Sequence, residues 1–361
     1  MSQPEALREL PIPNFYRTVN ALDWGYAPNQ HTLFLAARAW RKEHNLRPAA
    51  ADRRRVHLLL VDVQKDFCFP RGTLYVGGRS GTGAMDDSDR LARFIYRNLE
   101  NLSEITCTLD THFPFQIFSP SFWLDANGEP PAPHREITTE DIRAGRVRPN
   151  PDVAAWVEPG VDPQAGEGWL RRQVEFYCAQ LEKAGKYKLY LWPPHCLLGS
   201  DGHPLVGVIH EARLFHAWSR GTRGGIESKG DHPLTENYSV LSPEVLFTWD
   251  GRQIAKRNAH FIETLLTADA VILAGQAASH CVKSTLDDLL DEIATRDPKL
   301  ARKVYVLRDC MSAVAVPDPE HPGNFVFDFT PQAEEALERW AAAGMRVVRS
   351  TEPIAEWGLN L

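Results

Sequence analysis

Short apolar runs that stop at a charged side chain or at a glycine recur along this chain, and they limit the folds open to it. Residues 56–62 form a near-continuous apolar run that ends at Asp62, and residues 271–274 form a second run. Such runs are typical of strands in parallel sheets, which are buried on both faces. Stretches with helical spacing separate the runs, and the sequence has no internal repeat. We therefore expect an α/β fold of three layers, in which helices flank a mainly parallel sheet.

The other predicted elements continue this alternation. We expect strands at residues 105–109, 188–191, 304–307 and 346–348, and an extended run at 224–229. We expect helices at residues 32–42, 88–99 with Ser88 as a candidate cap, 169–183, 205–219, 254–266, 283–294 and 331–342. Residues 1–50 are too apolar for a disordered tail and should pack on the main domain as an N-terminal extension. Residues 51–361 form the main domain, in which repeated prolines predict an inserted lid or subdomain at about 119–187.

The composition excludes several classes of function. The 361 residues carry a net charge of −7, which argues against nucleic-acid binding, because phosphate recognition needs clustered Lys and Arg. Nowhere do about 18 apolar residues follow one another, and the N-terminus lacks the apolar core of a signal peptide. The six cysteines are scattered without metal-ribbon spacing. We expect a cytoplasmic protein that binds neither nucleic acid nor membrane and that could form a homo-oligomer.

Five chemically useful residues fall at or just after predicted strand ends: Asp62, Asp110, Trp192, Lys229 and Cys281. In open α/β sheets the ligand binds outside the carboxyl ends of the strands, so these residues should converge on one rim. Cys281 would begin a helix, whose dipole favours a thiolate, while Asp62 would accept its proton and Lys229 would stabilise both charges. Each residue has a plainer alternative: the cysteine could be core, the aspartate a turn former and the lysine merely exposed.

A second cluster combines Asp110 and His112 with the distant His195. One carboxylate oxygen and two imidazole nitrogens suit Zn²⁺ or another first-row divalent ion with open coordination positions. The alternative is that both histidines are loop residues bonded to backbone, since the chain has 13 His. We interpret His280, beside Cys281, as a packing or loop-bonding residue, because adjacent helix residues point in different directions.

Several short segments, taken in chain order, carry a family resemblance. They are Asp62-Val-Gln-Lys-Asp-Phe-Cys68 with Gly77-Gly78, Leu109-Asp-Thr-His112, Trp192-Pro-Pro-His-Cys196, Ser228-Lys-Gly230 and Gly275-Gln-Ala-Ala-Ser-His-Cys-Val282. Together they resemble the nicotinamidase/pyrazinamidase branch of the isochorismatase-like cysteine hydrolases. The resemblance lies within residues 56–348 and does not extend to the first fifty residues or to most of the insert.

The resemblance implies roles for ten residues. It implies a catalytic triad of Asp62, Lys229 and Cys281, aromatic walls from Phe67 and Trp192, and a metal ion held by Asp110, His112 and His195. Zinc is the first expectation for this ion, with iron or manganese as alternatives. The resemblance also implies a cis peptide between Gln276 and Ala277, which would aim the N–H groups of Ala277 and Cys281 into an oxyanion hole.

The chain also departs from the family pattern. Gln116 stands near where many relatives carry a further histidine, and Ser279 stands where nicotinamidases commonly have Asp. The insert between His112 and Trp192 is longer than in compact relatives. These departures leave the substrate less constrained than the reaction class.

The implied activity is that of a metal-dependent cysteine amidohydrolase. Its first expected reaction converts nicotinamide and water to nicotinic acid and ammonia through a Cys281 thioester. The nearest alternative is a related cysteine hydrolase that acts on another small amide, carbamoyl or imide substrate. A third is a binding protein that keeps the fold without turnover, which the retention of the whole triad disfavours.

Overall fold

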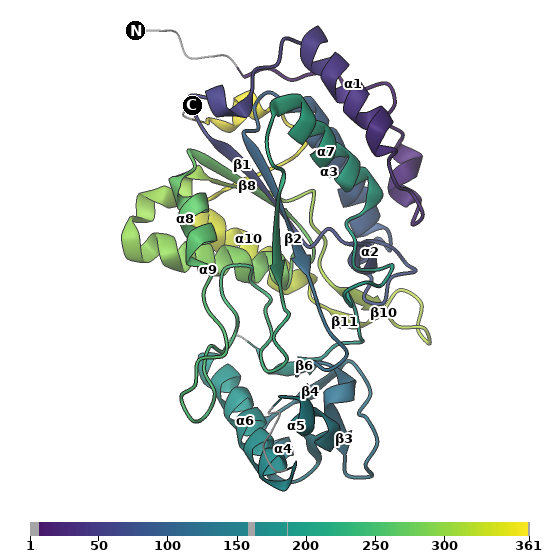
Figure 1. Cartoon of the computed structure of the whole chain (residues 1–361), viewed down its shortest axis with the longest axis vertical. Helices are drawn as coiled ribbons and strands as arrows, with labels where there is room; N and C mark the ends of the chain where they lie inside the picture. The colour runs from purple at the N-terminus through teal and green to yellow at the C-terminus, as the bar shows by residue number, and fades with distance from the viewer. Residues whose placement is uncertain (1–6, 158–162, 186, 360–361) are drawn as a thin grey trace. The chain divides into compact units, whose positions relative to one another are not determined.

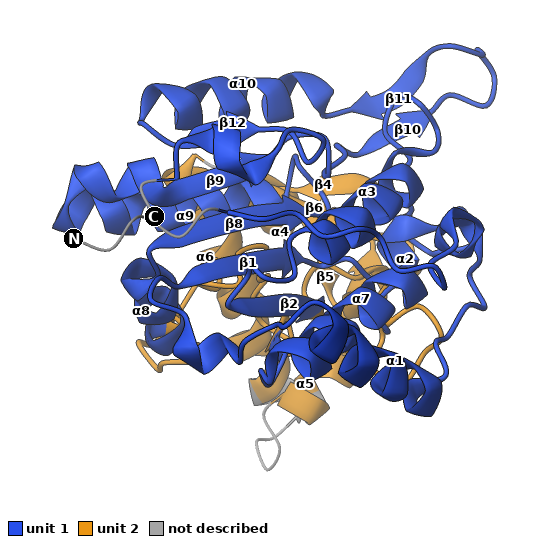
Figure 2. Ribbon diagram, turned by 90° about the horizontal axis from the view of Figure 1, so that it is seen from above, with its two compact units in different colours: residues 1–109, 204–227, 259–361 blue, residues 110–203, 228–258 orange. Residues whose placement is uncertain are grey.

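The computed structural model describes residues 7–157, 163–185 and 187–359, and the chain divides into two compact units (Figure 2). Unit 1 comprises Met1–Leu109, Pro204–Glu227 and Ala259–Leu361. Unit 2 comprises Asp110–His203 and Ser228–Asn258. The chain therefore leaves unit 1 twice and returns to it twice.

A six-stranded sheet organises the fold and confirms the predicted α/β class. Its order is β12 (Arg346–Val348), β9 (Val304–Leu307), β8 (Ala270–Gly275), β1 (Val56–Val61), β2 (Glu104–Asp110) and β7 (Gly225–Lys229). The pairs β12 with β9, β9 with β8, β8 with β1 and β1 with β2 are all parallel. Every residue of β1 and β8 is buried, as their near-continuous apolar sequences predict.

Helices cover both faces of the sheet. In Figure 1, α3 (Gly83–Arg97) and α7 (Gly207–Arg220) lie on one face with α1 (Gln30–Glu43) packed on α7, and α8 (Ala259–Thr267), α9 (Cys281–Arg296) and α10 (Thr330–Ala342) lie on the other. The chain proceeds from β1 toward one edge of the sheet and later from β8 toward the opposite edge. The junction of β1 and β8 is therefore the topological switch point, where open α/β sheets bind ligands.

One glycine permits the close approach of strands at this junction. Gly275 ends β8 opposite Val61, at φ +124°. A Cβ atom there would lie 2.0 Å from the Val61 carbonyl oxygen. Only glycine satisfies both the backbone conformation and the spacing.

The described N-terminal residues contact α3 and α7 within unit 1. Tyr16 Oη donates to Asp89 on α3 at 2.7 Å, and Tyr26 Oη donates to Glu211 on α7. Tyr96 Oη donates to the other oxygen of Glu211 at 2.8 Å. A buried carboxylate thus joins the N-terminal segment to the helices that cover the sheet.

Unit 2 contains short strands and helices. Strand β3 (Trp123–Asp125) pairs antiparallel with β5 (Val147–Pro149), and β4 (Arg135–Ile137) pairs antiparallel with β6 (Leu189–Leu191). The long helix α6 (Pro163–Ala184) packs on α4 (Thr139–Arg143) and α5 (Pro151–Val157). The expectation that Trp192 ends a strand of the main sheet is therefore wrong, because it follows β6 of a separate two-stranded sheet.

Several predicted boundaries also differ. Helix α3 begins at Gly83, and Ser88 is not its cap, since the Ser88 hydroxyl donates to the Ala84 carbonyl inside the helix. Helix α8 begins only at Ala259, because the N–H groups of Ile254 and Asn258 bond to Leu246 and Leu241. Sequence patterns missed the short α2 (Lys65–Cys68) and the hairpin of β10 (Ala315–Pro317) and β11 (Phe325–Asp328). In the part of the chain that the structure describes, no helix is both long and apolar enough to span a membrane.

Candidate active site and metal centre

The predicted site residues are distributed over both units. Unit 1 holds Asp62, Phe67, Gln276, Ala277 and Cys281, which we call the nucleophile group. Unit 2 holds Asp110, His112, Trp192, His195 and Lys229, which we call the cation group.

Cys281 is the first residue of α9, as predicted, and its side chain is buried. At this position the backbone N–H groups of the first helical turn and the helix dipole favour an anionic side chain. The preceding segment, Gln276–His280, connects β8 to α9, and the peptide bond between Gln276 and Ala277 is cis. The Gln276 N–H donates to the Val61 carbonyl at 2.7 Å, so the segment leaves the sheet directly beside β1.

Asp62 follows β1 and is fully buried, with a backbone φ of +47°. Thr108 fixes it in two ways within unit 1. The Asp62 N–H donates to Thr108 Oγ1 at 2.9 Å, and the same hydroxyl donates to Asp62 Oδ1. Thr108 was not predicted from the sequence, because nothing in a strand pattern marks a threonine that bonds to the next strand.

Ser279 and His280 form a local pair beside the nucleophile. The Val314 N–H donates to Ser279 Oγ at 3.1 Å, and Ser279 Oγ lies 2.9 Å from His280 Nδ1. The serine hydroxyl thus bonds both to the Val314 backbone and to the ring of the next residue. Burial, together with nearby Lys283, lowers the pKa of His280 to about 4, so the ring is neutral at physiological pH. These contacts agree with a packing and loop-bonding role for His280.

The cation group contains the donor cluster of Asp110, His112 and His195. One ligand atom from each of these buried residues lies within 4.8 Å of the others. His112 Nε2 lies 2.9 Å from Asp110 Oδ2, and His195 Nε2 lies 3.6 Å from the same oxygen. The other ring nitrogens donate to backbone carbonyls, that of His112 to Gly230 at 2.9 Å and that of His195 to Pro193 at 2.8 Å. Both rings therefore turn Nε2 toward the carboxylate.

This arrangement fits a divalent metal ion. A neutral imidazole that donates through Nδ1 presents a lone pair at Nε2, and here that lone pair faces a carboxylate oxygen. Two acceptors are stable at this distance only with a proton or a cation between them. Burial raises the pKa of Asp110, but His112 and Lys229 outweigh it and hold that pKa well below its usual value. Burial lowers the pKa of His112, but Asp110 outweighs it and the pKa is raised.

Lys229 bonds to the other oxygen of the same carboxylate. It ends β7 with its side chain buried, and its Nζ donates to Asp110 Oδ1 at 2.9 Å and to the Asn237 carbonyl at 2.9 Å. The two oxygens of Asp110 thus serve different partners. Gly230 follows at φ +84°, where a Cβ atom would lie 2.6 Å from His112 Cε1 and 2.8 Å from Asp110 Oδ1.

Gln116 bonds to the same backbone carbonyl as His112. Its Nε2 donates to the Gly230 carbonyl at 3.3 Å, the same oxygen that accepts from His112. Its Oε1 is buried and has no hydrogen-bond partner among the residues that the structure describes. Gln116 therefore helps to fix the backbone behind His112.

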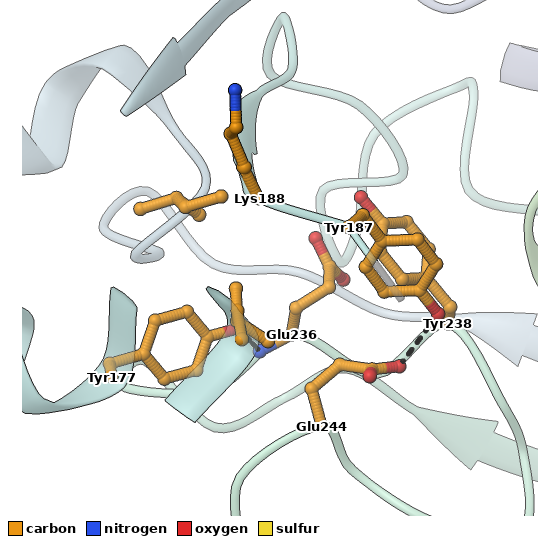
Figure 3. A pocket seen from close by; sticks show the side chains of 8 residues that line it. Tyr177, Tyr187, Lys188, Glu236, Tyr238 and Glu244 are labelled. Atoms are coloured by element: carbon orange, nitrogen blue, oxygen red, sulfur yellow. Dashed lines mark hydrogen bonds between the residues drawn. The ribbon is translucent and has the colours of Figure 1, made fainter. Parts of the chain in front are cut away.

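Glu236 is a buried acid that was not predicted from the sequence. Its Oε1 accepts from the Asn237 N–H at 3.0 Å, and its own N–H donates to Tyr177 Oη at 3.0 Å. Figure 3 shows its carboxylate between Tyr177 on one side and Tyr187 and Tyr238 on the other, beside a small pocket of about 10 Å³. Burial raises the pKa of Glu236 to about 7, and nearby His112 lowers it only in part.

The two predicted aromatic walls belong to different units. Trp192 is buried in unit 2, where its Nε1 donates to Tyr238 Oη at 2.8 Å and its ring centroid lies 4.4 Å from that of Tyr190. Phe67 is buried in unit 1 on α2, and its carbonyl accepts from the Val76 N–H at 2.8 Å. The assignment of both residues as substrate walls remains a prediction.

No protein-family model and no curated protein matched the chain. Among solved structures, the chain is similar to the yeast nicotinamidase, with 20% identity, a TM-score of 0.47, and coverage of 81% of this chain and 99% of that chain. It is similar to the pyrazinamidase of Pyrococcus horikoshii in complex with zinc, at 18% identity and a TM-score of 0.42, over 81% and 98% of the two chains. It is also similar to an Acinetobacter baumanii nicotinamidase/pyrazinamidase, at 18% identity and a TM-score of 0.47, over 83% and 98%.

Proposed function

We propose that this chain is a metal-assisted cysteine amidohydrolase of the nicotinamidase type, which hydrolyses a small planar amide to a carboxylic acid and ammonia. The observation that carries the proposal is the placement of Asp62, Cys281, Asp110 and Lys229. They end or directly follow β1, β8, β2 and β7, four strands that are neighbours in one sheet, although Cys281 comes after a short connecting segment. Nicotinamide is the first substrate to test, because of the sequence resemblance.

The nucleophile group supplies the covalent chemistry in this proposal. Asp62 takes the proton of Cys281, and the thiolate attacks the amide carbonyl carbon. The N–H groups of Ala277 and Cys281 stabilise the oxyanion that forms. The C–N bond then breaks while Asp62 gives its proton to the leaving amine, which departs as ammonia.

Water completes the reaction by cleaving the thioester. Asp62 takes a proton from the attacking water, the C–S bond breaks, and the Cys281 thiolate is regenerated with release of the acid. Lys229, already bonded to Asp110, stabilises the negative charges of the site. A divalent ion held by Asp110, His112 and His195 would supply a Lewis-acid contact that orients a ring nitrogen of the substrate.

Ammonia release from a panel of small amides tests the proposal. The panel includes nicotinamide, pyrazinamide, benzamide and a carbamoyl compound. A cyclic imide is tested beside them by appearance of its ring-opened carboxylate product, because opening the ring frees no ammonia. Metal content is measured on the same sample. Cys281→Ala should lower the rate on nicotinamide by at least about 1000-fold, the loss expected when a nucleophile is removed. Cys107→Ala, at a buried cysteine in β2, serves as the matched control and should retain activity. Ammonia release that survives Cys281→Ala would refute the mechanism.

The same panel separates the alternatives. Activity on another amide, carbamoyl or imide compound but not on nicotinamide keeps the reaction class and changes the substrate. Ser279 and the sequence of unit 2 would then be the features to examine. Failure of every compound, together with a Cys281 that reacts no faster than the other thiols, would favour a binding protein of the same fold.

A further inference from the structure

A buried carboxylate on α3 contacts the segment that presents Cys281. Asp87 Oδ2 accepts from Gln276 Nε2 at 2.9 Å and from Ser312 Oγ at 2.6 Å, while Oδ1 accepts from an Arg90 Nη at 2.7 Å. The Asp87 side chain is almost completely buried. Since three donors converge on it, one of them a guanidinium, Asp87 functions as an acceptor on both oxygens.

These bonds fix the orientation of the Gln276 side chain. Its NH₂ group faces Asp87, and its Oε1 accepts from the Ser312 N–H at 3.3 Å. Because a carboxylate accepts and a backbone N–H donates, only one of the two amide orientations satisfies both partners. Asp87, Gln276 and Ser312 therefore form one closed network.

The network continues into the backbone beside the nucleophile. The Ala278 N–H donates to the Ser312 carbonyl at 2.8 Å, and the Gly275 N–H donates to the Cys310 carbonyl at 3.1 Å. Helix α3 approaches this region closely, since a Cβ atom at Gly83 would lie 2.4 Å from Ser312 Oγ. Asp87 thus bonds to Gln276 in the Gln276–His280 segment and to Ser312 in the loop that follows β9, and these two segments contact each other.

We propose that Asp87 is a positioning residue for the proposed hydrolysis: through Gln276 and Ser312, its carboxylate fixes the segment that carries the Ala277 N–H group and delivers Cys281. This inference rests on the proposed function, and it adds a residue for which neither the sequence motifs nor the mechanism above has a role. Asp87 acts through other residues and does not touch the substrate. A displacement of the reacting groups by about 1 Å can lower a rate about 100-fold, so loss of this support should appear in kcat.

Asp87→Asn is the most direct test, since it nearly preserves the shape of the side chain. One oxygen becomes an NH₂ group, which must face either the Gln276 NH₂ group or the Arg90 guanidinium, and either choice opposes two donors. We expect kcat on the active amide to fall about 10- to 100-fold, with KM changed by less than about 3-fold. Asp89→Asn, on the same helix, replaces one of the two oxygens that accept from Tyr16 and Arg93 but alters no bond of this network, and should change kcat by less than about 2-fold.

A double variant distinguishes positioning from a purely structural role. Arg90→Gln offers a carbonyl oxygen in place of the guanidinium, so in Asp87→Asn/Arg90→Gln the new NH₂ group has an acceptor while the remaining oxygen serves Gln276 and Ser312. We expect this variant to recover at least about 5-fold of the lost kcat, and Arg90→Gln alone to stay within about 3-fold of the wild type. If Asp87→Asn does not fold, Ser312→Ala replaces it, with an expected fall in kcat of about 3- to 10-fold from the loss of about one hydrogen bond.

The outcomes separate this inference from the proposed function. A folded Asp87→Asn variant with wild-type kcat, or a double variant without recovery, would overturn the inference while the proposed function stands. If the wild type hydrolyses none of the amides, the proposed function fails, and the rate of Cys281 alkylation by iodoacetamide then tests the inference. That rate should differ at least about 5-fold between Asp87→Asn and Asp89→Asn, and equal rates would overturn the inference.

Discussion

Substituting Gly275 by alanine should strongly destabilise unit 1, because it adds a methyl group where β8 and β1 are in close contact. The residue has a φ of +124°, and the added Cβ atom would lie 2.0 Å from the Val61 carbonyl oxygen and 2.6 Å from the Val61 nitrogen. The unfavourable backbone conformation costs about 1–3 kcal/mol. Relieving the overlap requires β8 to move away from β1, which costs about a further 1–3 kcal/mol. We expect a total loss in the free energy of unfolding of about 2–6 kcal/mol.

Gly81→Ala provides a matched control for this prediction. Gly81 also has a positive φ, of +79°, but a Cβ atom there would have no neighbour within 4 Å. Its substitution should therefore cost only the backbone contribution, about 1–2 kcal/mol. Urea unfolding of both variants, followed by circular dichroism, measures the difference. A Gly275→Ala variant that loses no more stability than Gly81→Ala would refute the reasoning from close packing of β1 and β8.

Three further predictions concern the metal cluster, the buried His57 and Ser279. We expect elemental analysis to find about one divalent ion per wild-type chain, and His195→Ala should lose this ion. His260→Ala, exposed on α8, should keep it, and equal metal content in the two variants would contradict the cluster. Burial lowers the pKa of His57 to about 4, so between about pH 6.5 and 4 the unfolded chain binds the extra proton and stability falls as the pH falls. His57→Gln should reduce this loss in the free energy of unfolding by about 1–3 kcal/mol, measured by urea titration at several pH values. His31→Gln, exposed on α1, should leave the loss unchanged. Ser279→Ala should lower the free energy of unfolding by about 1–3 kcal/mol in the same urea titration, because the Val314 N–H loses its acceptor. An unchanged urea midpoint would contradict this role of Ser279 as an acceptor.

The sequence was sufficient to predict features that depend on local pattern. Apolar runs predicted the strands β1 and β8, and the placement of Cys281 at the start of α9 followed from a strand, a glycine and a helical pattern. The donor types and the strand end at Asp110 predicted the cluster with His112 and His195. For the strands and for Cys281 neighbouring residues carried the information, whereas His195 is distant in the chain and was included because of its residue type and the family resemblance.

The missed features depend on pairs that are distant in the chain. Asp87 bonds to Gln276 across 189 positions and to Ser312 across 225, and no local pattern marks either partner. Thr108 bonds to Asp62 across 46 positions. The strand before Trp192 was assigned to the wrong sheet, because three apolar residues do not reveal whether their partner is parallel or antiparallel. Apolar patterns and spacing thus identified helices and strands. The residues that hold the site residues in place could be found only from contacts between distant parts of the chain.

The interleaving of the two units has a consequence for how this chain folds as it is made. Strand β1 is complete at Val61, but its parallel neighbour β8 begins only at Ala270, after both stretches of unit 2 have been synthesised. Until then, the edge of β1 that will face β8 has no native strand to pair with, and unpaired edges of apolar strands are sites of aggregation. Unit 2 likewise needs residues up to Asn258 before its second stretch is complete. Central sheet assembly is therefore a late event that depends on contacts more than 200 positions apart, between Val56 and Ala270 for example, which places this fold among slowly folding topologies.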